Sequence, residues 1–130
     1  MLSSFPLDVS LLATDLNIAK DFYSDRLGLP IIMETADGVT FGCGGGSRLV
    51  VTKSTTGTAD TQTQALWRVS DLAKEIIDLR SRGVQTDTYG VPGPTEDVAD
   101  VGFALTTWFV DPFNNSIGLI QLKTIETAQT

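Results

Sequence analysis

The chain has 130 residues, of which 42% are hydrophobic and 19% charged, a balance typical of a globular domain rather than a disordered segment. Its net charge of −7 disfavours nucleic acid and anionic membranes as partners. The absence of histidine excludes Ser-His and Cys-His nucleophiles and the usual imidazole ligands of transition metals. A single cysteine, no apolar run of about 20 residues and no signal-peptide pattern at the N-terminus predict a cytoplasmic location.

The first half of the chain predicts a strand, a helix and three further strands. Asp15 is placed to cap a helix whose apolar residues recur at helical spacing from Leu16 to Leu27, and Gly28 is the expected stop. Phe22 and Tyr23 are adjacent on this helix, so one is expected to be less buried than the other. Apolar content and turn residues predict strands over residues 7–14, 30–35, 39–43 and 48–53.

The second half repeats this order. Asp71 is the second expected cap, 71 − 15 = 56 residues after the first, and it precedes a helix that ends at Gly83. Strands are expected over residues 64–70 and 84–90, followed by a loop rich in Pro, Gly and acid and by two strands joined through the sequence DPFNN. The simplest role of that sequence is a tight turn, in which Asn tolerates a positive φ angle.

The repeat predicts an α+β fold of two βαβββ modules within one domain. The first module is expected over residues 6–53, a linker over 54–62, the second module over 63–122 and a tail over 123–130. One module alone is too small to bury an adequate core, so the two are expected to pair. Each helix should then cover the outside of its own sheet, while the sheets form a curved cup that would hold a ligand.

Three stretches resemble the vicinal oxygen chelate superfamily, which includes glyoxalase I, extradiol dioxygenases and bleomycin resistance proteins. They are DVSLLATDLNIAKDFYSDRLGLPI near the start, VSDLAKEIIDLRSRGV in the second half and WFVDPFNN near the end. The resemblance implies the paired-module fold and a homodimer. This fold hosts many activities, so it does not identify one.

The resemblance also implies where metal ligands would lie. Metal-binding members place the first ligand seven residues before the first cap, here Asp8, and its counterpart here is Gln64. A glutamate usually lies seven residues after the aspartate of the final turn, where this chain has Gly118. The remaining ligand would fall near Leu49 to Val51. Two weak oxygen donors would hold a divalent transition ion poorly, so no metal and no cofactor are expected.

Strand alternation predicts which polar residues face the cup. Asp8 and Ser10 share one face of the first strand, and Gln64, Leu66 and Arg68 share one face of the fifth. The alternative is that Asp8 and Arg68 pair with each other or lie at a solvated rim. Trp67 is expected in the core, whereas three other aromatic residues are candidate stacking walls for a planar ligand: Phe41, Tyr89 and Trp108.

Three functions are compatible with these observations. The leading hypothesis is a metal-independent protein that binds an aromatic or cationic small organic molecule in the cup. The first alternative is a glyoxalase-like lyase or dioxygenase with an oxygen-only metal site made by Asp8, Gln64 and Glu34. The second is a structural dimer or partner-interaction module. The acidic loop with Glu96, Asp97 and Asp100 is either a solvated loop or a cation-attracting rim of the cup.

Overall fold

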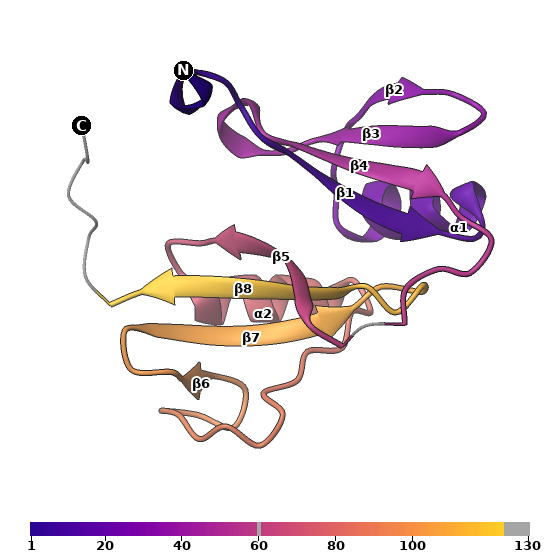
Figure 1. Ribbon diagram of the computed structural model, residues 1–130. Helices are drawn as coiled ribbons and strands as arrows, with labels where there is room; N and C mark the ends of the chain where they lie inside the picture. The colour runs from indigo at the N-terminus through magenta and orange to yellow at the C-terminus, as the bar shows by residue number, and fades with distance from the viewer. Residues whose placement is uncertain (60, 124–130) are drawn as a thin grey trace. The chain divides into compact units, whose positions relative to one another are not determined.

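The computed structural model describes residues 1–59 and 61–123, so all but the first residue of the expected tail 123–130 lies outside the described residues. The chain divides into two compact units. Unit 1 consists of Met1–Gln62 and Val110–Asn115, and unit 2 consists of Thr63–Phe109 with the residues from Ser116 onward. In Figure 1 the strands of unit 1 run from indigo to magenta and those of unit 2 continue to yellow. None of the helices among the described residues is long and apolar enough to cross a bilayer.

Unit 1 contains a four-stranded mixed sheet in the order β1-β4-β3-β2. β1 and β4 run parallel, whereas β3 runs antiparallel to both β4 and β2. The strands are β1 (Asp8–Ala13), β2 (Ile31–Glu34), β3 (Gly38–Gly42) and β4 (Arg48–Lys53). Short 3-10 turns cover Leu2–Ser4 and Gly44–Gly46.

The helix of unit 1 begins where the sequence predicts. The Asp15 carboxylate accepts hydrogen bonds from the backbone N–H groups of Asn17 and Ile18, at the start of α1 (Leu16–Lys20). The helix then widens into a π-helical segment, Asp21–Arg26, and Gly28 follows at φ 74°. Phe22 is less buried than Tyr23, as expected, but the difference is small, since their exposed fractions are 7% and 0%. The wider π turn changes the angle between successive side chains, so both rings can reach the core.

Unit 2 contains a second four-stranded sheet in the order β5-β8-β7-β6, in which β5 and β8 run parallel. Its strands are β5 (Thr63–Arg68), β6 (Ala99–Asp100), β7 (Ala104–Val110) and β8 (Ser116–Leu122). Asp71 caps α2 (Leu72–Ser81), which packs on β8 (Figure 1). Both units therefore have the order βαβββ, and the predicted α+β class is confirmed.

One predicted strand is absent from the described part of unit 2. Residues 84–90 form only an isolated bridge between Asp87 and Trp108, and the second strand of the module is instead the short β6. The backbone cannot continue as a strand because Tyr89 has φ 51° and Gly90 has φ 77°. The segment from Val84 to Val98 is consequently a loop, which leaves helix α2 and returns to the sheet at β6.

Each sheet has one face toward its helix and one open face. On β1, Leu11 and Ala13 are buried while Asp8, Ser10 and Leu12 are exposed, as alternation predicts. On β5, Ala65 and Trp67 pair in register with the buried Ile117 and Leu119 of β8, which places them on the helix side. Leu66, between them, is 57% exposed on the open face.

Candidate functional site

The open face of the second sheet has an apolar patch around Gly118. Leu66 lies opposite Gly118 in the β5–β8 register. A Cβ atom added to Gly118 would lie 2.5 Å from Leu66 Cδ2 and 3.2 Å from Trp108 Cδ1. Leu66 and Trp108 therefore occupy the space that a side chain at this position would need. A glutamate at this position, where the superfamily resemblance places a metal ligand, would require Leu66 and Trp108 to move.

Tyr89 extends this patch. Its ring centroid lies 5.7 Å from that of Trp108, with the planes inclined by 57°. This spacing is in the range of favourable aromatic pairs. Trp108 is half-buried, whereas Tyr89 is 59% exposed. Leu66, Trp108 and Tyr89, called here the aromatic patch, thus present an apolar and aromatic surface formed by two strands and a loop of unit 2.

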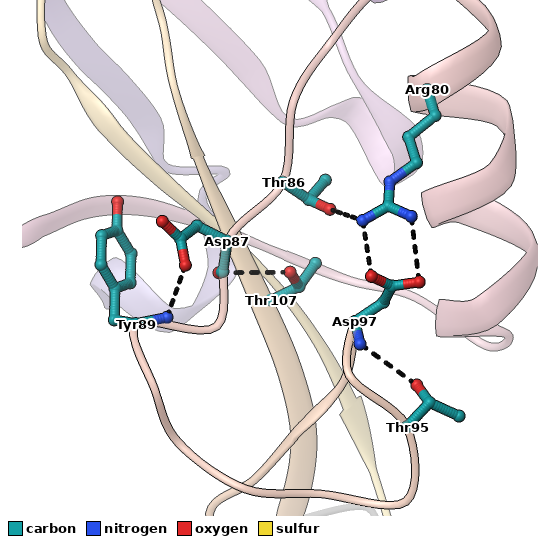
Figure 2. Close-up of polar contacts among 7 residues, drawn as sticks. All are labelled: Arg80, Thr86, Asp87, Tyr89, Thr95, Asp97 and Thr107. Carbon is teal, nitrogen blue, oxygen red and sulfur yellow. Dashed lines mark hydrogen bonds and ion pairs between the residues drawn. The ribbon is translucent and has the colours of Figure 1, made fainter.

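The loop that carries Tyr89 is fixed at both ends by one residue of α2. Arg80 donates from Nη1 and Nη2 to the two carboxylate oxygens of Asp97, at 2.9 and 2.7 Å, and from Nη2 to Thr86 Oγ1 at 3.3 Å (Figure 2). Asp97 N–H in turn donates to Thr95 Oγ1. Because Thr86 and Asp97 lie on opposite sides of Tyr89 in the sequence, Arg80 holds together the two ends of this loop. The two parallel hydrogen bonds from Arg80 to Asp97 form a bidentate pair, which restricts the relative orientation of the two side chains.

Asp8 is not available as a free carboxylate. Arg48 donates to its two oxygens, from Nε at 3.2 Å and from Nη2 at 2.8 Å. The hydrogen bond from Arg48 holds the pKa of Asp8 below its ordinary value. The ion pair foreseen between Asp8 and Arg68 is thus replaced by one with Arg48, which lies directly beside Asp8 in the β1–β4 register.

Gln64 has a structural role in the second sheet. The β5–β8 register shifts between Thr63 and Ala65, so Gln64 lies at a bulge. Its Oε1 accepts a hydrogen bond of 2.6 Å from the backbone N–H of Ser116. The side chain therefore replaces a missing bond of the sheet, and among the described residues nothing pairs with its amide N–H groups.

Phe41 was wrongly predicted as a wall for a ligand. It is fully buried, pairs in register with the buried Leu49 and packs 5.5 Å from Tyr23, centroid to centroid. Its neighbour Thr40, opposite Val50, lies on the other face of β3 and is also buried. Pairing Phe41 with the apolar Leu49 across β3 and β4 would have predicted that Phe41 is buried. Ser10 is exposed on the open face of the first sheet, and the exposed Arg68 ends β5.

The remaining acidic candidates are engaged in ion pairs. Glu34 accepts from Lys20 Nζ at 2.6 Å, and Asp100 accepts from Lys123 Nζ at 2.8 Å with both of its oxygens. The Lys123 ammonium, with the Gly102 N–H, lowers the pKa of Asp100. With Asp97 bound to Arg80, two of the three acidic loop residues are paired surface groups rather than a free cation-attracting rim.

The residues at the superfamily's ligand positions do not fit a divalent ion. Asp8 binds Arg48, the Gln64 oxygen binds Ser116, and Gly118 is covered by apolar side chains. Within residues 1–59 and 61–123, no three Asp, Glu or Cys side chains are grouped so as to hold a metal ion. Transition ions in proteins need several strong donors converging on one point, which this arrangement does not supply.

The turn with the sequence DPFNN is structural, as predicted. Asp111 is buried and accepts hydrogen bonds from Tyr23 Oη (2.6 Å), from the Phe113 and Asn115 backbone N–H groups (2.9 and 2.8 Å) and from Asn115 Nδ2 (2.7 Å). Asn114 adopts the expected positive φ, 67°. Burial, and secondarily the Asp111 charge, raise the pKa of Tyr23 far above its ordinary value, so Tyr23 stays a donor.

Solved structures of other proteins share this architecture. No protein-family model and no curated protein sequence matches the chain. Among solved structures, TnmS3, an antibiotic binding protein from Streptomyces sp. CB03234, is similar with 25% identity and a TM-score of 0.74, over 95% of this chain and 99% of that one. A glyoxalase/bleomycin resistance protein from the same organism is similar with 25% identity and a TM-score of 0.65, over 88% and 96%. A glyoxalase family protein from Enterococcus faecalis shares 19% identity with a TM-score of 0.69, over 92% and 99%.

The chain therefore has the fold of the glyoxalase/bleomycin resistance/dioxygenase proteins of the vicinal oxygen chelate superfamily, as its three motifs predicted. Members with this fold include binders as well as enzymes, so the fold does not decide between them.

Sequence reasoning missed three residues of the site. Leu66 was assigned to the correct face but not recognised as the side chain that covers Gly118. Arg48 and Asp87 were not singled out, although Arg48 follows a glycine-rich turn and Asp87 lies two residues before Tyr89. The signal for Asp87 was available, because Asp commonly bonds the backbone N–H two residues further on.

Proposed function

We propose that the chain is a metal-independent binding protein that holds a planar organic molecule against the open face of the second sheet. The observation that carries the proposal is the aromatic patch over Gly118, with Leu66 and Tyr89 more than half exposed. Exposed aromatic rings on a rigid sheet are a common means of binding flat ligands. The likeness to an antibiotic binding protein supports a binding role.

The use of the expected donors in other contacts supports the proposed metal independence. Asp8 and Glu34 are bound to Arg48 and Lys20, and the Gln64 oxygen is bound to a backbone N–H group. An ion would have to break these contacts and still lack a third strong ligand. The lyase or dioxygenase alternative would need such an ion, so it is the less supported function.

The polar contacts of the ligand are proposed from the side chains near the patch. The Gln64 amide can donate to a ligand carbonyl or ring nitrogen, because only its oxygen is engaged among the described residues. Asp8, Ser10 and Arg68 stay predicted contacts, and Asp8 would act as part of its pair with Arg48. The cup expected between the two halves likewise stays a prediction.

The two tryptophans provide a matched test. Trp108 belongs to the aromatic patch, whereas Trp67 is directed toward the helix side of the same sheet. Titration calorimetry of EDTA-treated protein with planar organic molecules should give binding that Trp108→Leu weakens by roughly tenfold or more. Trp67→Leu, once shown to be folded, should leave the affinity unchanged. Binding that disappears with EDTA and returns with a divalent ion would instead favour the metalloenzyme.

We also infer that the chain forms a homodimer in the cytoplasm. Ile31, Ile32 and Met33 of the edge strand β2 are 41%, 54% and 55% exposed, an apolar run that an interface would cover. The single cysteine suits a reducing compartment. Light scattering during size exclusion tests the dimer directly, and a monomer at every concentration would contradict it.

A further inference from the structure

Tyr89 has a backbone conformation that its residue type rarely adopts. Among the described residues only Tyr89 and Asn114 combine a side chain with positive φ, at 51° and 67°. Asn is a residue type that tolerates this region, whereas a bulky aromatic residue there is an outlier that costs free energy. Such a conformation persists only where surrounding contacts enforce it.

Asp87 supplies those contacts. Its Oδ1 accepts a 2.8 Å hydrogen bond from the Tyr89 N–H, while its backbone exchanges two bonds with Trp108, at 2.8 and 3.0 Å. Thr107 Oγ1 also donates to the Asp87 carbonyl (Figure 2). Asp87 is thus bonded to the sheet on one side and to the backbone of Tyr89 on the other. It fixes the turn that directs the Tyr89 ring onto Trp108.

The positive φ of Tyr89 does not bury its side chain in the core. Tyr89 remains 59% exposed, although a strained residue that contributed mainly to the core would be expected to be covered. Its ring contacts Trp108 at the edge of the aromatic patch and leaves most of its surface to solvent. Strain combined with exposure is the pattern found where a side chain is held ready for a ligand.

The same turn places a negative charge beside the rings. Only Oδ1 of Asp87 is bonded, and no group among the described residues donates to Oδ2. Aromatic faces attract cations, and an adjacent carboxylate adds to that attraction. The net charge of −7 acts in the same direction at longer range.

We propose that Asp87 and Tyr89 make the aromatic patch selective for a positively charged planar ring system. Tyr89 contacts the ligand, and Asp87 both positions Tyr89 and attracts the ligand's charge. The inference rests on the proposed binding function and deepens it by naming the ligand class.

Two probes of nearly equal shape test this selectivity. At neutral to mildly alkaline pH, 9-aminoacridine is a cation and acridine is neutral. The wild-type protein should bind the cation about fivefold more tightly, the ratio that an exposed cation–π contact supplies. Added salt should weaken binding of the cation more than binding of acridine.

Three variants separate the roles. Asp87→Asn keeps an oxygen that can accept from the Tyr89 N–H but removes the charge. The affinities of this variant for 9-aminoacridine and acridine should therefore differ by no more than about twofold. Asp25→Asn, an exposed residue of unit 1, makes the same change in net charge and should leave the ratio intact. Tyr89→Asn tolerates the positive φ and should weaken both probes without lowering the thermal midpoint.

The outcomes are distinguishable. If wild-type protein binds neither probe nor any other planar molecule, the proposed function itself fails and this inference with it. If both acridines bind equally, the binding function stands and the selectivity is wrong. A Tyr89→Asn protein with a clearly lower thermal midpoint would show that Tyr89 is a packing residue, and unchanged affinity in that variant would remove it from the site.

Discussion

The open faces of the two sheets differ although their strand orders match. Across the first sheet the register aligns Ser10, Val50, Thr40 and Met33, a row of small, hydroxyl and aliphatic side chains. The equivalent row of the second sheet contains Leu66, Gly118 and Trp108. In the first sheet the smaller residue, Ser10, lies on β1 and the larger one, Val50, on its parallel partner β4. In the second sheet the larger residue, Leu66, lies on β5 and the smaller one, Gly118, on its parallel partner β8.

This reversal indicates which features of a duplicated module are fixed. The strand orders correspond because they depend on the backbone and the helix side of each sheet, whereas the β5–β8 register contains a shift that the β1–β4 register lacks. The open face only requires that neighbouring volumes fit together, so a large residue beside a small one satisfies either order. In the second sheet a tryptophan packs against a glycine, and the partly exposed ring of Trp108 pairs with that of Tyr89.

The largest expected effect concerns the interior of unit 1, which depends on a buried carboxylate. Asp111→Ala removes the acceptor of Tyr23 Oη, of the Phe113 N–H and of two Asn115 donors. Leaving these groups unpaired should lower the free energy of unfolding by about 3–5 kcal/mol, measured by urea denaturation. Asp111→Asn, which keeps an acceptor, should lose clearly less. An effect under about 1 kcal/mol would contradict the role of this turn.

The second prediction concerns variants that give the second sheet the residue pair of the first sheet. Gly118→Val should destabilise the protein by roughly 1–3 kcal/mol, because the new side chain overlaps Leu66 Cδ2. Adding Leu66→Ser gives the pair found in the first sheet, Ser10 with Val50, and should recover at least half of the loss. A double-mutant cycle measures this coupling. Strictly additive effects would mean that the two positions do not share one volume.

The third prediction concerns the pH dependence of unit 1. Burial and the Asp111 charge raise the pKa of Tyr23 in the folded state, so its stabilising contribution is complete below the unfolded value of about 10 and is lost as pH rises above it. The slope from this group should approach about −1.4 kcal/mol per pH unit. Tyr23→Phe should lack that slope in alkaline denaturation curves, whereas Tyr89→Phe should retain it.

The smallest effect is expected at the Asp8–Arg48 pair, since the two side chains are 35% and 43% exposed. The bond from Arg48 lowers the pKa of Asp8, so any stabilisation is present above the ordinary carboxyl pKa of about 4 and fades as pH falls below it. Asp8→Asn should shift the thermal midpoint by less than about 3 °C at neutral pH. A larger loss would indicate that the pair supports more of the first sheet than its exposure suggests.

Much of the site was accessible from alternation and residue type. Residue type identified Trp108 and Tyr89 as stacking candidates, whereas the superfamily resemblance identified Gly118 as a position without a ligand side chain. Phe41 was misplaced because the face of β3 depends on its register with β4, where it lies opposite the buried Leu49. The strand predicted over 84–90 failed because the left-handed turn at Tyr89 has no signature in residue type, since tyrosine itself favours strands.

The sequence by itself determined the two capped helices, seven of the eight strands within residues 1–59 and 61–123, and the fold, because capping, alternation and turn preferences act within a few residues. Only the tertiary structure decided the partners of the polar groups. The bond from Tyr23 to Asp111 spans 88 residues, and the pair of Asp8 with Arg48 spans 40. Such contacts depend on how strands register and helices pack. No local pattern records them, and the strained Tyr89 turn exists for the same reason.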